Sequence, residues 1–381
     1  MREGETVSPL ELFFDLVFVL AFTQCTALMA DEPTWEGLAK GLLVLGVLWW
    51  SWVGYAWLTS VVDPEEDAVR LVIFGAMAAL LVVGLAVPGA FGDAGLIFAC
   101  AYAFVRIMHI ALFMLASRDD ANLRTSVIGL GISTAIASGL LVGASFADGA
   151  LQGGLWALAL VLDIAGPYFF GAEGWKLAPH HFSERHGLIM IIALGESIVA
   201  VGVGAEARVD AGIVVAAVLG AAVAAALWWL YFDVVALVAA RRLAGAAVGR
   251  EQNEMARDSY SILHLPMVAG IVLLALGMKK TLGHVDGPLK LVPATALLGG
   301  TAMYLLAHVA FRYRHIRTLN TRRLAWSGLL VAFIPVAVQI PALATIFALA
   351  AALVVLIVVE TRSYGESRAR TRAELRHEGE H

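Results

Sequence analysis

Long apolar runs separated by short polar segments dominate the chain. Twelve of these runs are long enough to cross the hydrocarbon core of a bilayer as helices, which takes about 20 residues. An open sheet cannot cross lipid, because its edge amides would lack hydrogen-bond partners, and the runs are too long for the strands of a barrel. The pattern predicts an all-α membrane protein with about twelve transmembrane helices, at residues 9–30, 38–62, 69–88, 95–117, 125–146, 151–171, 183–204, 211–238, 260–278, 290–312, 324–340 and 342–359.

Composition supports a membrane protein. Hydrophobic residues make up 60% of the chain and charged residues 15%, with a mean hydropathy of +0.81. Water-soluble chains carry about 45–50% apolar and about 25% charged residues, because water does not tolerate an apolar outer surface. The two cysteines, Cys25 and Cys100, both lie in apolar runs, so we expect no disulfide framework. No cationic leader with a cleavage site precedes the first run, which we expect to be an uncleaved signal anchor.

The basic residues are distributed unevenly between the loops. Most of the 26 Lys and Arg residues lie in the N-terminal segment, in the loops after even-numbered runs and in the C-terminal tail. Basic residues accumulate on the cytoplasmic side of membrane proteins. We therefore expect both termini to be cytoplasmic.

Similar features recur in the same order in the two halves of the chain. The second run ends with "LWWSWVGYAWL" and the eighth contains "LWWLYFDVVAL". His109 lies in the fourth run and His308 in the tenth, each nine residues before an arginine. Glu11 opens the first run and Glu184 opens the seventh. Because six is an even number of spans, both halves would enter from the same side, and the order predicts two parallel six-helix repeats.

These repeats define the expected organisation of the chain. We expect a first six-helix unit at 1–178, a second at 179–362 and a polar cytoplasmic tail at 363–381. Superposition of the units should bring Trp49 onto Trp228. Duplicated halves that face each other are a recurrent plan of transporters, with substrate sites near the midplane between them.

The start of the first run combines a helix cap with a deeper carboxylate. Ser8 can be the N-cap, Pro9 the first helical residue and Glu11 the third, which together form a capping box. Asp15 lies one turn deeper on the same face as Glu11. A charge inside the hydrocarbon region is costly, so Asp15 should face the bundle and pair with a basic residue. We expect that partner to be Arg106, with Glu196 as the competing carboxylate.

The seventh run contains a second concentration of ionisable residues. Glu184, Arg185 and His186 lie at its beginning, where we expect them at the cytoplasmic mouth. Glu196 falls near the middle of the run, where a carboxylate is costly and indicates either proton or substrate handling or a structural ion pair.

Further titratable residues predict a polar vestibule. Asp163 lies four residues before Pro167, which removes the amide that would bond the Asp163 carbonyl and so favours a local opening of the helix. A single histidine in a core is usually hydrogen-bonded and structural. Several histidines with carboxylates in the cytoplasmic half instead predict a vestibule that leads toward Glu196 and Asp163. Its expected members are Glu11, Asp15, Arg106, His109, Asp233, His264 and His308.

Several motifs carry a family resemblance. The segments "SPLELFFDLVFVLAFTQ", "HFSERHGLIMIIALGESIVAVG", "ALWWLYFD" and "SILHLPMVAGIVLLALG", with the Arg106 and His109 pair, resemble the bacterial low temperature requirement protein A family over nearly the whole chain. The resemblance implies a multi-pass protein of the bacterial inner membrane in a family named for growth in the cold. Carried over by position, the family motif residues are Glu11, Asp15, Arg106, His109, Glu184, Arg185, His186, Glu196, Asp233 and His264.

Three classes of function are consistent with these sequence features. The span count, the repeat and the buried titratable groups favour a secondary transporter or a proton-linked permeation pathway. A non-transporting structural or regulatory protein would fit a cold-growth phenotype but would leave the deep carboxylates unexplained. An intramembrane enzyme acting on lipid is the third class, but the chain has no Gly-x-Ser-x-Gly elbow, zincin motif or phosphate-binding glycine loop. We therefore expect no enzymatic activity.

The remaining expectations concern ligands. His180, His181 and His186 lack the spacing of a zinc site, so we expect neither a metal nor a cofactor. The expected partners are the lipid bilayer and a small solute or proton, and not nucleic acid.

Overall fold

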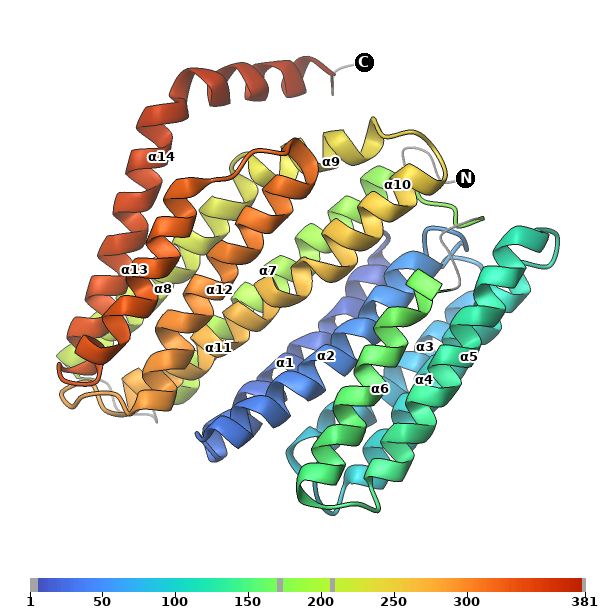
Figure 1. The fold of residues 1–381 in the computed structure, drawn as a ribbon, viewed down its shortest axis with the longest axis horizontal. Coiled ribbons are helices and arrows are strands. Elements are labelled where there is room, and N and C mark those ends of the chain that lie inside the picture. Colours follow the sequence, from blue (N-terminus) through green and yellow to red (C-terminus); the bar gives the residue numbers. More distant parts are fainter. Residues whose placement is uncertain (1–5, 170–173, 206–209, 379–381) are drawn as a thin grey trace.

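The computed structural model describes residues 6–169, 174–205 and 210–378, with side chains as far as Ser363. Within these residues the protein is built of helices and contains no strand. Figure 1 shows α3 to α6 on one side of the bundle and α8 with α12 to α14 on the other. The helices α1, α2, α7 and α11 lie between these groups, so that elements distant in sequence meet in the centre. The all-α fold predicted from the apolar runs is confirmed.

The first six long helices pack mainly on one another. α1 packs on α2 and α3, α3 on α4, α4 on α5, α5 on α6, and α2 closes the group against α6. Each helix follows one apolar run of the sequence. Their bounds are α1 Pro9–Asp31, α2 Trp35–Leu58, α3 Asp67–Ala86, α4 Gly95–Ala116, α5 Ala121–Ala144 and α6 Gly149–Phe169, with a 3-10 turn, η1, at Val87–Gly89.

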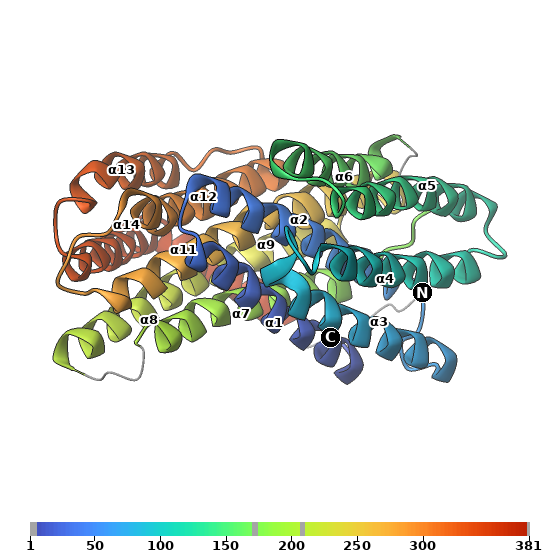
Figure 2. The ribbon, with the colours of Figure 1, turned by 90° about the horizontal axis from the view of Figure 1, so that it is seen from below.

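The second group contains the remaining helices and is interrupted twice. The helical backbone is interrupted at Asp233 and Val234 after α8, and the short helix α9 and a turn connect α8 to α10. A π-helical segment then joins α10 to α11. Figure 2 shows this group beside the first, with α7 next to α1. The bounds are α7 Pro179–Gly204, α8 Ala211–Phe232, α9 Val235–Ala244, α10 Arg250–Met255, η2 (the π-helical segment) Ala256–Ile262, α11 His264–Gly283, α12 Leu291–Ile316, α13 Thr321–Ala337 and α14 Ala342–Glu378.

Eleven helical segments of the described chain are long and apolar enough to cross a bilayer. The sequence predicts about twelve, and the difference is the run at 324–340. It corresponds to α13, which has 17 residues and is about 25 Å long. That length is at the lower end of what the hydrocarbon core requires.

The core is centred on α11 and its neighbours. Glycines allow α11 and α12 to approach closely, because a Cβ atom on Gly270 would lie 2.5 Å from the carbonyl oxygen of Gly300. Small residues at such contacts are typical of helix packing in membranes. The outer helices instead expose large apolar side chains, such as Leu71 of α3, which is 70% exposed. This distribution suits lipid around the outside and polar chemistry in the centre.

Candidate functional site

The capping box predicted at the start of α1 is confirmed. The hydroxyl of Ser8 accepts a hydrogen bond from the Glu11 backbone N–H at 3.3 Å, and the Glu11 carboxylate accepts one from the Ser8 N–H at 3.0 Å. Glu11 is also fully buried, and its carboxylate lies 2.9 Å from Nε2 of His181 on α7. Glu11 therefore links α1 to α7 in addition to capping its own helix.

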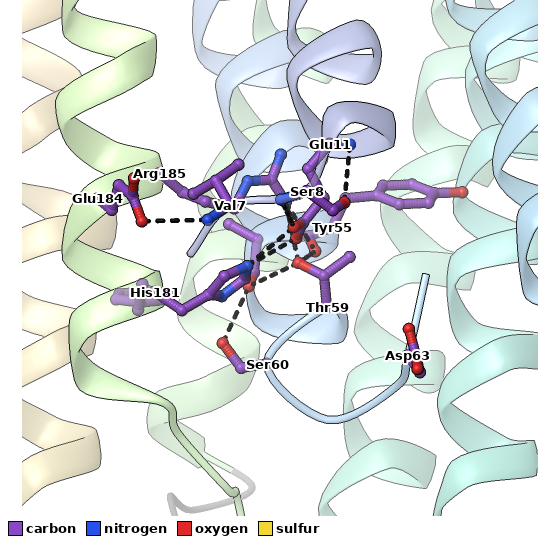
Figure 3. Close-up of polar contacts among 12 residues, drawn as sticks. Val7, Ser8, Glu11, Tyr55, Thr59, Ser60, Asp63, His181, Glu184 and Arg185 are labelled. Carbon is purple, nitrogen blue, oxygen red and sulfur yellow. Dashed lines mark hydrogen bonds and ion pairs between the residues drawn. The ribbon is translucent and has the colours of Figure 1, made fainter. Parts of the chain in front are cut away.

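Asp15 is buried and faces the bundle, as expected, but its predicted partner is wrong. The carboxylate accepts a hydrogen bond from Arg185 at 2.5 Å and one from the indole N–H of Trp52 at 2.8 Å. Arg185 is itself buried and donates to the hydroxyl of Thr59 at 3.0 Å. Figure 3 shows Arg185 reaching from α7 toward Glu11, Tyr55 and Thr59.

The depth of the helices explains the correction. Asp15 and Arg185 each lie six residues after the first residue of their helix, about 9 Å along its axis. α1 and α7 pack together and begin on the same side of the bundle, so the two side chains meet at one depth. The apolar run predicts that the seventh helix begins at 183, whereas α7 begins one turn earlier, at Pro179. Arg185 and His186 are therefore inside the bundle, while Glu184 is exposed and accepts the backbone N–H of Val7.

Arg106 forms a second buried ion pair, with Asp163 of α6. Its Nη2 atom lies 3.0 Å from the Asp163 carboxylate and donates to the hydroxyl of Thr134 at 2.7 Å. Thr134 and Tyr102 also donate to Asp163. α4, α5 and α6 are thus tied together by one carboxylate. The network predicted between Arg106 and Asp15 is replaced by two separate pairs.

A small cavity of about 50 Å³ lies beside the Arg106 pair. Within the described residues, neither ring nitrogen of His109 has a partner at hydrogen-bond geometry, and the same holds for Nε of Arg106. Gly54 makes room on α2, since a Cβ there would lie 2.9 Å from the His109 ring. The volume is sufficient for a water molecule. The lining residues include Trp50, Trp57, Arg106, His109, Pro167 and Trp175, and also Asn253, Arg257 and Ser261 from α10 and the π-helical segment.

Three of the predicted histidines, His186, His264 and His308, form a row with Tyr231 across the second group of helices. The rings of His186 and His264 lie 5.2 Å apart, and Nε2 of His264 is 2.8 Å from the hydroxyl of Tyr231. The Tyr231 ring lies 5.7 Å from that of His308. The row begins near Asp15, because Trp52 contacts the His186 ring edge-on. It connects α7, α11, α8 and α12 through buried groups.

The row ends at a third buried ion pair, between Arg323 and Glu360, which was not predicted from the sequence. Arg323 binds Glu360 with two hydrogen bonds, of 3.0 and 2.9 Å, and lies 2.7 Å from Nδ1 of His308. Arg323 stands near the beginning of α13, where a basic residue is usually attributed to the headgroup region. Its burial depends on α12 and the middle of α14 packing beside the start of α13, which no local pattern indicates.

Glu196 and Asp233 lie apart from these three pairs. Glu196 is 1% exposed and accepts a hydrogen bond from the hydroxyl of Thr23 on α1 at 2.5 Å. Its partner is therefore a hydroxyl, and Arg106 is bonded to Asp163 instead. Asp233 is buried at the end of α8. Apart from Asp233, the predicted vestibule residues thus divide into those around Asp15, those around Arg106 and those of the histidine row.

Comparison with known proteins identifies the family. The sequence model of the bacterial low temperature requirement A protein matches residues 6–359. An uncharacterized protein of Rhizobium meliloti (strain 1021) is 30% identical over 311 residues, which cover 77% of this chain and 74% of that protein. No solved structure matches the chain. Because the family model spans nearly all of the helices described above, the chain belongs to the bacterial low temperature requirement A protein family.

Proposed function

We propose that the protein is a secondary transporter or a proton-linked permeation pathway of the bacterial inner membrane. The observation that carries the proposal is the cavity beside Arg106 and His109. Its lining combines residues of α2 and α4 with residues of α10 and the π-helical segment. An ionisable group at membrane depth that borders a cavity is expensive to maintain and is typical of ion and proton pathways. π-helical segments inside helices also occur frequently at functional sites.

The arrangement of helices supports two parallel six-helix units, at 1–178 and 179–362, with a cytoplasmic tail at 363–381. In the first unit α1 contacts α2 and α3, and the chain of contacts continues from α3 to α6 and back to α2. In the second, α7 contacts α8 and α11, and the chain continues through α12 and α13 to α14 and back to α8. The order is the same. Trp49 and Trp228 differ in environment, however, since Trp49 is buried and Trp228 is 45% exposed.

The proposed chemistry is the movement of a proton or small solute, without an enzymatic step. Glu196 lies about 26 Å along α7, far deeper than Asp15 and Arg185, which are near the start of their helices. A carboxyl group held by a hydroxyl can gain and lose a proton without breaking a buried ion pair. Glu196 is therefore the best candidate for a proton carrier, and His109 is the candidate acceptor at the cavity.

Glu196→Gln is expected to abolish proton flux into liposomes that contain the purified protein and a trapped pH-sensitive dye. Glutamine keeps the size of the side chain and its hydrogen bond to Thr23 but cannot release a proton. Glu184→Gln is the matched control, because Glu184 is an exposed carboxylate on the same helix. The control should retain full flux. If Glu196→Gln conducts as well as the native protein, the proposed role of Glu196 is wrong.

The liposome measurement also addresses the competing function. A correctly folded protein that shows no flux under any proton or solute gradient would favour a structural or regulatory role in the membrane. The charged groups would then serve to bind helices together, as the Asp15 and Arg106 pairs do.

The proposed orientation places both termini in the cytoplasm, because most Lys and Arg residues lie on the side where α1 begins. A reporter enzyme that is active only outside the cytoplasm should be silent when fused after α14. The same reporter inserted between α1 and α2, next to Asp31, should be active. The reverse result would invert the proposed topology.

A further inference from the structure

A second cavity, of about 430 Å³, opens in the second group of helices. It lies where α8 joins α9, where α12 ends, where α13 begins and where α14 passes Glu360. It shares no described lining residue with the cavity at Arg106. Its size is within the range of pockets that hold small organic ligands, about 300–1,000 Å³.

The charges of this pocket favour an anion. Arg242, Arg312 and Arg323 line it, and the carboxylate among the lining residues is that of Glu360. Arg323 binds both oxygens of Glu360 and neutralises it. Among the lining residues that the structure describes, the guanidinium group of Arg242 adds positive charge beyond the Arg323 pair. Guanidinium groups match the oxygens of a phosphate in geometry as well as in charge.

Buried histidines supply an independent indication of a ligand. His315 is 8% exposed and lines the pocket, yet neither of its ring nitrogens has a hydrogen-bond partner among the described residues. His308 also lines the pocket, and its Nε2 atom likewise has no partner in the described part of the chain. Buried polar atoms are rarely left without a partner, because the lost hydration is not replaced. An acceptor in the cavity would satisfy these nitrogens.

The helix that begins in the pocket adds to the same preference. Asn320 caps α13 and lines the cavity, so the positive end of the helix dipole is directed at this region. Helix N-termini bind phosphate groups readily. Apolar residues complete the wall, among them Val235, Val238 and Phe311, and can contact a carbon skeleton attached to the anion.

We propose that this pocket binds the phosphate group of an organic ligand, with Arg242 on the phosphate oxygens and His315 as a hydrogen-bond donor. The phosphate can belong to a soluble phosphorylated metabolite or to a phospholipid headgroup, since the recognition chemistry is the same. The site is independent of the proposed transport pathway and rests on a different cavity.

The test uses the full chain purified in detergent at constant ionic strength. Glycerol phosphate and inorganic phosphate are titrated by calorimetry, and phosphatidylglycerol retention is measured by native mass spectrometry. Arg242→Gln should weaken binding of the retained ligand by roughly 10- to 100-fold, since a charge-assisted hydrogen bond is lost. Arg241→Gln is the matched control, because Arg241 is the neighbouring exposed arginine of α9 outside the described pocket lining, and it should leave affinity within about twofold.

The two arms distinguish the sources of the phosphate. Saturable binding of glycerol phosphate identifies a soluble ligand, and retention of phosphatidylglycerol without glycerol phosphate binding identifies a headgroup. His315→Phe should weaken either ligand, while His315→Gln, which keeps a donor, should weaken it less. Absence of both kinds of binding overturns the proposal. Equal losses in Arg242→Gln and Arg241→Gln, or displacement by the same concentration of chloride, would also overturn it.

Discussion

Asp163→Asn is expected to lower the free energy of unfolding by about 3–5 kcal/mol, because it leaves the buried guanidinium of Arg106 without a counter-charge. Asp163 accepts hydrogen bonds from Arg106, Thr134 and Tyr102, so one carboxylate joins three helices. Arg106 cannot escape the loss by shedding its proton, since a guanidinium stays charged in proteins. The uncompensated charge therefore weakens the packing of α4, α5 and α6 around Arg106.

Unfolding of the protein in mixed detergent micelles measures this effect. Asp148→Asn serves as the control, because Asp148 is exposed just before α6 and its replacement should change the unfolding free energy by less than about 0.5 kcal/mol. If Asp163→Asn is as stable as Asp148→Asn, the Arg106 pair contributes nothing to the fold.

A double variant separates the structural from the functional role of this pair. Arg106→Met combined with Asp163→Leu removes both charges and fills the same space with apolar groups. Such replacements are often neutral or stabilising. The double variant should therefore regain most of the stability lost in Asp163→Asn while remaining inactive in the liposome assay. Full activity in a stable double variant would show that transport does not use the pair.

The sequence predicted the helices because their signal is local. Each apolar run is set by the width of the bilayer, and the capping box depends on residues three apart. The run at 324–340 has the same 17-residue length as α13 but is displaced by three residues, because it included the turn after Ala337 and missed the polar start of the helix at Thr321. The fold class and most of the helix positions could thus be derived without knowing which helices are neighbours.

The pairing of charges was not predictable in the same way. It depends on which helices are adjacent and on where each begins. Placing the start of α7 four residues too late moved Arg185 to the headgroup region and left Arg106 as the apparent partner of Asp15. Arg323 was missed for the same reason: the predicted run began at 324, so Arg323 fell outside it, whereas α13 begins at Thr321. Comparing depths from corrected helix starts would have matched Asp15 with Arg185.

Arg185→Gln should be the most destabilising single change in the molecule, with a loss of at least about 3–5 kcal/mol in the free energy of unfolding. It removes the charge partner of Asp15 and leaves the nearby carboxylate of Glu11 with His181 and the Ser8 backbone N–H as partners. Glu184→Gln, one residue earlier but exposed, is the matched control and should have little effect. Equal melting of the two variants in detergent would contradict the prediction.

The geometry of the arginine fork makes the prediction more specific. Arg185 donates from one nitrogen to Asp15 and from another to Thr59 and the carbonyl of Tyr55, so it joins α7 to both α1 and α2. A lysine has a single ammonium group on a shorter reach and cannot serve both directions at once. Arg185→Lys should therefore recover only part of the stability lost in Arg185→Gln. Adding Asp15→Asn to Arg185→Gln should recover part as well, because it removes the stranded carboxylate while the Trp52 indole can still donate to the remaining amide oxygen.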